Sequence, residues 1–239
     1  PFWAPHHTIS PAGLSGGGSI PRPGELSLAH NGVLFLDELP EFPHATMEVL
    51  RQPIEDGTVT ISRVSGSVTY PCSIMLVAAM NPCPCGYFGH PTRRCTCRPA
   101  AVERYLNRVS GPLLDRLDLH IEVPPVNFDE LSAPRCGDSS EQIRRRVNDA
   151  RKIQNQRFAG TGISCNARIP TEMLDDICML TRAGRKLLRE AFEKLDLSAR
   201  AYDRVLKVAR TIADLAGSEE IEPAHVAEAV QYRSLDHKY

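Results

Sequence analysis

The amino-acid sequence predicts an α/β fold that is built on a parallel sheet and followed by a helical subdomain. Two observations lead to this prediction. Short apolar runs typical of fully buried strands recur through the first half of the chain, separated by helical stretches and long loops. Beyond about residue 139 the hydrophobic pattern is helical throughout. We therefore expect an α/β subdomain over residues 1–134 and a helical subdomain over residues 135–239.

The first segments along the chain are a loop, a strand and a helix. Residues 1–31 are rich in Gly, Pro and Ser, which predicts loops and turns with little regular structure. The run VLFLD at 33–37 predicts a buried strand. A short helix is expected over residues 44–52, ending before Pro53.

A hairpin and two more strands complete the predicted sheet region. Polar and β-branched residues alternate over 58–71, which predicts a β-hairpin with its tip near 64–67. The apolar run at 74–80 predicts a second buried strand, and LDLHIEV at 117–123 predicts a third. Buried strands with long connections between them favour a parallel arrangement.

The second half contains a series of helix start and stop signals. Ser139 and Gln142 form a capping box that opens a helix extending to about Phe158. The remaining expected helices follow Pro170-Thr171, cover about 182–195, run from Ser198 to Gly217, and begin at Pro223.

Composition limits the partners and the compartment. The net charge of −1 predicts no global attraction to nucleic acid or to an anionic membrane, so such contacts must come from local patches. The longest apolar run, at 74–80, is far short of the roughly 20 residues that span a bilayer, so we expect no membrane partner. Four of the eight cysteines are scattered singly, as in reduced intracellular proteins, which favours the cytoplasm.

Polar side chains follow two of the predicted strands. Asp37 and Glu38 end the first strand, at the sheet edge where ligands of open α/β folds bind. In phosphoryl-transfer sites the first such acid holds Mg²⁺ through water, and the second can polarise the attacking water. The alternative is that both acids only end the strand and begin a polar turn. Asn81 follows the second strand and should lie beside the acids, where its amide can bond a phosphate oxygen or a water.

An arginine precedes the third predicted strand. Arg116 in GPLLDRLDLH could stabilise phosphate charge in a neighbouring subunit. The alternative is an ion pair with Asp115 or Asp118, worth little if it is exposed.

Four stretches in this order and spacing resemble one family of ATPases. They are PGELSLAHNGVLFLDELPEF, AAMNPCPCG, GPLLDRLDLH and LSARAYDRVLKVARTIADL. Together they look like the Mg-chelatase-like branch of AAA+ ATPases, and most closely the bacterial YifB/ComM family. The resemblance covers about residues 1–237 and implies the C-terminal part of an AAA+ P-loop NTPase core followed by an α-helical lid subdomain.

The resemblance implies a role for each matching residue, with ATP and Mg²⁺ as cofactors. Its assignments are Asp37 for the Mg²⁺-bound water, Glu38 as catalytic base, Asn81 as sensor 1, Arg116 as an arginine finger acting on the next protomer's nucleotide, and Arg200 as sensor 2 with Arg204 as the alternative.

The chain departs from the family pattern in one respect. AAA+ ATPases need a Walker A loop, G-x-x-x-x-G-K-[ST], whose backbone amides and Lys bind the phosphates. This chain contains no Gly-Lys pair. In the family that loop lies upstream, so we expect a C-terminal portion that by itself neither binds ATP tightly nor hydrolyses it.

The hairpin at 58–71 suggests what such a motor would act on. In the resembling family this position holds the pre-sensor-1 hairpin, which projects into the pore of a hexamer. Arg63 lies near the expected tip, where a cation can follow a phosphate backbone without reading bases. The alternative is an ordinary surface hairpin.

Three functions fit the resemblance. The first is a hexameric branch-migration helicase that acts on single-stranded or branched DNA in natural transformation. The second is a chelatase-type motor that remodels a protein partner for Mg²⁺ insertion into a porphyrin. The third is an assembly module in which the nucleotide only holds a ring together, and the intact acids Asp37 and Glu38 argue against it.

Four cysteines in MNPCPCGYFGHPTRRCTC predict a metal site. Cys83, Cys85, Cys95 and Cys97 form two C-x-C pairs, which is an imperfect match to the usual C-x₂-C spacing of structural zinc. Disulfides, free thiols and an Fe–S cluster are the alternatives, and His90 is a possible substitute ligand. Four protein ligands would close the site, so we predict a structural and not a catalytic metal.

A pair of histidines, His6 and His7, lies in the predicted N-terminal loop. Adjacent side chains in an extended loop point apart, so two ligands to one ion are not expected. We place both as loop residues on the nucleotide or pore side.

Overall fold

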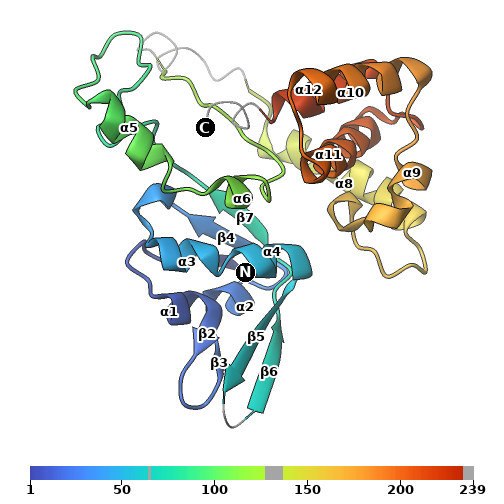
Figure 1. The fold of residues 1–239 in the computed structure, drawn as a ribbon. Helices are drawn as coiled ribbons and strands as arrows, with labels where there is room; N and C mark the ends of the chain where they lie inside the picture. The colour runs from blue at the N-terminus through green and yellow to red at the C-terminus, as the bar shows by residue number, and fades with distance from the viewer. Residues whose placement is uncertain (64–65, 127–136, 234–239) are drawn as a thin grey trace. The chain divides into compact units, whose positions relative to one another are not determined.

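The computed structural model of the chain describes residues 1–63, 66–126 and 137–233. The chain divides into two compact units, unit 1 over residues 1–117 and unit 2 from Asp118 onward (Figure 1). Each unit has its own hydrophobic core. The α/β fold followed by a helical part is as the sequence predicts. The expected subdomain boundary at 134/135 lies outside the described residues.

Unit 1 is built on a parallel sheet with the strand order β1–β4–β7. The strands are β1 (Phe2–Trp3), β4 (Val33–Leu36) and β7 (Met75–Ala78). Leu34 and Leu36 are fully buried, which explains why an uninterrupted apolar run forms the middle strand. The strands predicted at 33–37 and 74–80 are thereby confirmed.

The third predicted strand is wrong. Residues 117–123 form no strand, and most of their apolar side chains are exposed where a buried strand was predicted. Ile121 and Val123 are 67% and 81% exposed, whereas His120 is buried. The His120 backbone N–H donates to the carbonyl oxygen of Tyr232 over 2.7 Å, so this segment pairs with a helix end and not with a sheet.

The N-terminal region is more ordered than its composition suggests. It contains α1 (Pro11–Ser15), the antiparallel pair β2 (Gly16–Gly17) and β3 (Arg22–Pro23), and α2 (Glu25–Leu28). Glycine is required at position 16, where φ is 97° and an added Cβ would lie 2.4 Å from the Arg22 carbonyl oxygen. The glycines that suggest a loop therefore allow a tight hairpin.

The helix expected at 44–52 forms as two shorter helices. They are α3 (His44–Glu48) and α4 (Arg51–Asp56), and they follow the 3₁₀ turn η1 (Leu39–Glu41). Pro53 lies in the first turn of α4, where no intrahelical N–H bond is lost, so it does not end a helix as predicted.

The predicted hairpin is confirmed as β5 (Thr58–Arg63) and β6 (Gly66–Pro71), although residues 64–65 at its tip lie outside the described ranges. The β2–β3 hairpin runs alongside it (Figure 1). Tyr70 donates its hydroxyl proton to the Pro21 carbonyl oxygen over 3.0 Å, which ties the two hairpins together. Two helices follow β7, namely α5 (Pro99–Leu106) and α6 (Gly111–Leu114).

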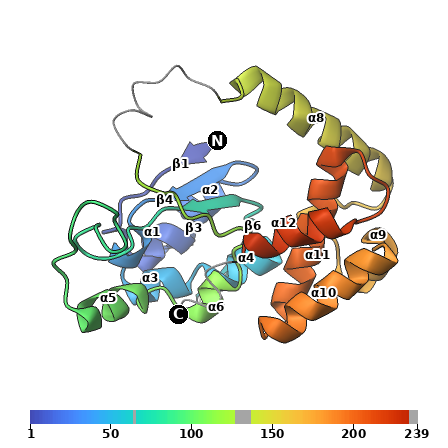
Figure 2. The same cartoon turned by 90° about the horizontal axis from the view of Figure 1, so that it is seen from above.

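Unit 2 is helical. Its elements are α8 (Ser140–Arg157), η2 (Asn166–Arg168), η3 (Thr171–Met173), α9 (Leu174–Ile177), α10 (Arg182–Lys194), α11 (Ala199–Ala216) and α12 (Pro223–Gln231). The Ser139/Gln142 capping box is present, and α12 packs against α10 and α11 (Figure 2). The helix expected after Pro170-Thr171 is only a 3₁₀ turn and one short helix. Within the described residues, no helix combines the length and the apolar character needed to cross a membrane.

Candidate active site

The two acids and Asn81 lie at the carboxyl edge of the sheet. Leu36 of β4 is paired with Ala78 of β7, and the polar residues follow directly on these strand ends. Two backbone hydrogen bonds extend the pairing beyond the strands. The Ala79 N–H donates to the Leu36 carbonyl, and the Leu39 N–H donates to the Ala79 carbonyl, each over 2.9 Å. The parallel register therefore holds the turn after β4 against the segment that leads to Asn81.

Glu38 has an unusual backbone conformation. Its φ and ψ are 54° and 47°, the left-handed region, which costs a non-glycine residue roughly 1–2 kcal/mol. Its N–H donates to Asp37 Oδ1 over 2.9 Å, and both acidic side chains are exposed. This turn directs the two carboxylates into solvent at the sheet edge, where a metal ion or a water can reach them.

Glu38 is contacted by His7, which the sequence placed only as a loop residue on the nucleotide or pore side. His7 Nδ1 lies 3.2 Å from Glu38 Oε2. The only signal in the sequence was the pair of adjacent histidines, which carries no information about a carboxylate 31 positions further along.

Helix α5 connects the acidic turn to the Asn81 segment. Arg108, just after this helix, donates to the Pro40 carbonyl over 3.1 Å and to Glu41 Oε2 over 2.9 Å. Burial raises the pKa of Tyr105, and the negative charge of Glu41 raises it further, while a hydrogen bond from the Asn81 backbone acts in the opposite direction. Helix α5 thus contacts the Asn81 segment through Tyr105, and the residues just after it contact the acidic turn through Arg108.

Arg116 has a partner that the sequence did not suggest. Its Nη2 lies 3.1 Å from Glu55 Oε2, its Nη1 donates to the Pro112 carbonyl, and its side chain is only 11% exposed. Asp118, one of the two alternative partners, pairs with Arg204 over 2.6 Å.

The two arginines considered for sensor 2 both lie on α11 in unit 2. Arg200 is exposed in the first turn of this helix, while Arg204 is half-buried and paired with Asp118. Their roles at a nucleotide stay predictions.

Arg63 is exposed at the end of β5. Its Nε donates to the Gly18 carbonyl over 3.3 Å, and its Nη1 donates to the Ser62 carbonyl over 2.9 Å. The β2–β3 loop, which the sequence did not reveal as a hairpin, therefore supports this arginine.

The cysteine cluster, defined as Cys83, Cys85, Cys95 and Cys97, converges on one point. Its four sulfur atoms lie within 4.8 Å of one another, and three of the separations are 3.4, 3.5 and 3.7 Å. Four thiolates around zinc at about 2.3 Å would have S···S separations of about 3.8 Å, so the arrangement fits a tetrahedral metal site. The described cysteines are all free thiols, and His90 is not part of the group.

The thiols of the cluster differ in how readily they ionise. Backbone hydrogen bonds to the sulfur from Tyr87 and Thr96 lower the pKa of Cys85 to about 5, whereas burial raises the pKa of Cys97, and burial and the neighbouring thiols raise that of Cys95 to about 12. A thiolate at neutral pH is the form that binds metal. Cys83 is fully buried, and the cluster packs against Val102, Tyr105 and Leu106. The cluster is therefore attached to the same helix that contacts Asn81.

Comparison with known proteins identifies the family. The family model described as "Magnesium chelatase, subunit ChlI" matches residues 1–131, and "Magnesium chelatase, subunit ChlI C-terminal" matches residues 137–233. The chain belongs to the magnesium chelatase family.

Proteins of the ComM/YifB type are similar to the chain over nearly its whole length. It is 48% identical over 236 residues to "Competence protein ComM" of Haemophilus influenzae, covering 98% of this chain and 45% of the relative. It is 46% identical over 239 residues to "Uncharacterized protein YifB" of Escherichia coli, covering 99% and 46%. The "Magnesium-chelatase 67 kDa subunit" of Heliobacterium mobile is 28% identical over 221 residues, covering 87% and 31%. The chain spans about half the length of the ComM and YifB relatives.

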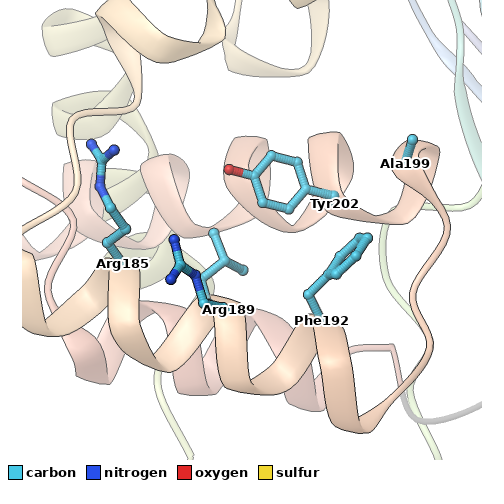
Figure 3. Close-up of a pocket in the computed structure, with 6 residues that line it drawn as sticks. Arg185, Arg189, Phe192, Ala199 and Tyr202 are labelled. Atoms are coloured by element: carbon cyan, nitrogen blue, oxygen red, sulfur yellow. The ribbon is translucent and has the colours of Figure 1, made fainter.

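A pocket of about 410 Å³ lies in unit 2 of this magnesium chelatase family chain. Arg185, Arg189, Phe192 and Tyr202 of α10 and α11 surround it (Figure 3). The Phe192 and Tyr202 rings meet edge to face with centroids 5.9 Å apart. Its lining contains none of the residues assigned to the nucleotide, so the cavity is not the predicted ATP site.

Proposed function

We propose that this chain is part of an AAA+ ATPase of the ComM/YifB type and carries the hydrolytic half of its ATP site. The observation that carries this proposal is the placement of Asp37, Glu38 and Asn81 at one carboxyl edge of a parallel sheet in a magnesium chelatase family chain. Asp37 would hold the Mg²⁺ of bound ATP through water, and this ion neutralises phosphate charge. Glu38 would orient the attacking water. The Asn81 amide would donate a hydrogen bond to a phosphate oxygen.

The phosphate-binding loop would come from residues outside this chain. The 239 residues contain no Gly-Lys pair, and the chain spans about half of its ComM and YifB relatives. We therefore propose that the motor is a longer protein, called the full-length protein below.

The isolated chain should show no ATP turnover above background. Without backbone amides and a lysine around the β- and γ-phosphates, the acids have no positioned substrate. Phosphate release by the purified 239-residue chain, measured with Mg²⁺ and millimolar ATP, checks this, with the full-length protein as the positive control. Turnover by the isolated chain that is lost in Glu38→Gln would contradict the prediction.

The full-length protein is proposed to work as a ring, a hexamer in the AAA+ pattern. Arg116 would act on the next protomer's nucleotide, and Arg200 or Arg204 would act as sensor 2 from the helical lid. Arg200 is our first choice, because it lies in the LSAR stretch that matches the family and is exposed in the first turn of α11. In a ring, Arg116 would exchange its contact with Glu55 for the neighbour's phosphate.

DNA is the proposed substrate, and the activity is branch migration on single-stranded or branched DNA during uptake and recombination. The relative named "Competence protein ComM" is 48% identical, whereas the magnesium-chelatase subunit is 28% identical, which favours the DNA motor over the chelatase-type motor. Arg63 is exposed on the β5–β6 hairpin, which is hydrogen-bonded to the β2–β3 hairpin. This position favours a contact between Arg63 and a DNA phosphate.

Arg63→Ala should lower the DNA stimulation of ATP turnover in the full-length protein. Losing one phosphate contact should weaken DNA binding for all sequences and reduce the slope of log affinity against log salt by about 1. ATPase assays with and without branched DNA, together with binding measured at several salt concentrations, check this. Arg104→Ala on the exposed face of α5 is the matched control. Unchanged stimulation in Arg63→Ala would count against the DNA proposal.

A structural zinc ion is proposed at the cysteine cluster. We expect about one zinc per purified chain, with no visible colour of the kind an Fe–S cluster would give. Cys83→Ser should remove most of the metal, because one of four thiolates is lost, while Cys165→Ser in unit 2 should retain it. Metal analysis and absorption spectra decide this, and a metal-free wild-type protein purified under reducing conditions would refute the site.

We place the full-length protein in the cytoplasm. ATP and reducing conditions are both available there, and the seven described cysteines are all free thiols.

A further inference from the structure

The contact between His7 and Glu38 links two segments that are far apart in the sequence. His7 Nδ1 and Glu38 Oε2 are 3.2 Å apart, with side chains 30% and 52% exposed. A carboxylate oxygen only accepts hydrogen bonds, so a hydrogen bond across this contact would require a proton on His7 Nδ1. The partly open surroundings leave room for a water or a phosphate next to the carboxylate.

His7 is part of a rigid turn. The Ile9 N–H donates to the His6 carbonyl over 3.0 Å and closes the turn. The hydroxyl of the buried residue Thr46 donates to the Ile9 carbonyl over 3.2 Å, which attaches the turn to α3. The His6 ring lies against the His7 ring with centroids 4.0 Å apart, so the expectation that these two side chains point apart is wrong. The imidazole is therefore supported from its own turn and from a neighbouring helix.

Glu38 needs such support more than most residues. Its left-handed backbone directs the side chain away from the sheet, and a glutamate keeps several rotatable bonds when it is exposed. A general base is efficient only if its carboxylate is within hydrogen-bond reach of the water it activates. A donor fixed at one oxygen restricts the rotamer and leaves the other oxygen, Oε1, to face the water.

We propose that His7 is a positioning residue for Glu38. It donates from Nδ1 to Oε2 and holds the carboxylate so that Oε1 orients the attacking water. His7 acts through Glu38 and has no contact of its own with ATP in this role. The inference rests on the proposed ATPase function. Its test must therefore distinguish a wrong role for His7 from a wrong assignment of the ATPase function.

The test is ATP turnover by the full-length protein carrying substitutions at position 7. His7→Ala should lower kcat about ten-fold and change KM for ATP little, because orientation of the water is lost and ATP contacts are kept. His7→Asn should recover most of the rate, because an asparagine amide places an N–H donor close to the position of Nδ1. His7→Gln, whose amide is one bond further out, should recover less.

A double-mutant cycle separates positioning from a general structural effect. In a Glu38→Gln background, His7→Ala should have no further effect, because the group on which it acts is already lost. His44→Ala is the matched control, since it removes an exposed histidine that pairs with Glu48 in the same unit. Thermal unfolding of each variant shows whether the fold is kept.

The outcomes are distinguishable. If the wild type shows no turnover that depends on Glu38, the proposed function fails first. If Glu38→Gln abolishes turnover but His7→Ala equals the wild type or is faster, only the role of His7 is overturned. Equal losses from His7→Ala in the wild-type and Glu38→Gln backgrounds, or the same rate for the Ala and Asn variants, would also overturn it.

Discussion

Glu38→Gln should lower ATP turnover by the full-length protein by about 10²–10⁴-fold while ATP binding is kept. Glutamine keeps the size of the side chain and one oxygen, so the left-handed turn and the His7 contact need not be rebuilt. It cannot accept a proton from water at the rate of a carboxylate. The loss should therefore appear in kcat, whereas the affinity for ATP should change little.

The measurement is steady-state turnover together with equilibrium binding of a fluorescent ATP analogue. Asp37→Asn is a second variant to measure in the same assay. It should lower turnover and should also raise the Mg²⁺ concentration needed for turnover. Glu103→Gln, at an exposed position of α5, is the matched control and should have no effect. A Glu38→Gln protein with the wild-type rate would mean that the acids only end β4 and begin a turn.

The sheet edge could be predicted from the sequence because its physical signals are local. A run such as VLFL has to be buried on both faces, and acids placed directly after it must then lie at the strand end. The same argument applied to the run at 74–80 placed Asn81 at the same edge. The parallel pairing of β4 and β7 confirms the geometry of this argument, while the roles of the residues stay proposals.

The rest of the site depends on contacts between distant segments, which a local pattern does not contain. His7 reaches Glu38 because the β1–β4 pairing brings the N-terminal turn beside the acids. The error at 117–123 has a related cause. The apolar residues of LDLHIEV predicted a buried strand, but a strand forms only where a neighbouring strand can share its hydrogen bonds. Here the His120 N–H donates to the Tyr232 carbonyl at the end of α12.

The cysteine cluster is intermediate between these cases. The four thiols are close in sequence, so their convergence followed from the spacing, and the structure brings the sulfur atoms together. Its attachment to α5, and through Tyr105 to Asn81, required the fold. Metal loss should therefore disturb the segment that carries Asn81.

The largest effect on stability is expected at a buried charge network in unit 2. Asp214 on α11 is fully buried and accepts hydrogen bonds from Arg157 over 2.5 and 2.8 Å, from Asn166 over 2.7 Å, and from Arg210 over 3.1 Å. Arg210 is itself buried and also donates to the Ser218 carbonyl. This one carboxylate joins the end of α8, the turn η2 and α11.

Asp214→Asn should destabilise unit 2 by about 3–5 kcal/mol, because removing one partner leaves buried guanidinium charge uncompensated. Asp203→Asn is the matched control on the same helix. Asp203 is half-buried and accepts a hydrogen bond from the exposed Thr171 hydroxyl over 2.9 Å, so this change should cost far less. Both variants replace an aspartate of α11 with an asparagine, so they differ only in how deeply the side chain is buried and in its charged partners.

The same network predicts how stability depends on pH. Burial acts to raise the pKa of Asp214, but hydrogen bonds from Arg157 and Asn166 outweigh it, so the folded-state pKa is lowered. A lowered folded pKa means that the stabilisation is present above the unfolded value, about 3.9, and is lost as pH falls through the folded pKa. Below about pH 4 the wild type should lose this stability, while Asp214→Asn has none of it to lose.

Two optical signals separate the units in the unfolding experiment. Trp3, in unit 1, is the only tryptophan, whereas the long helices α8, α10 and α11 of unit 2 dominate the far-UV circular dichroism. Asp214→Asn should shift the urea midpoint of the dichroism signal and leave that of the fluorescence unchanged. Because each unit has its own core, a shift confined to dichroism is the expected result. A wild-type midpoint in Asp214→Asn would show that the arginines are compensated without the carboxylate.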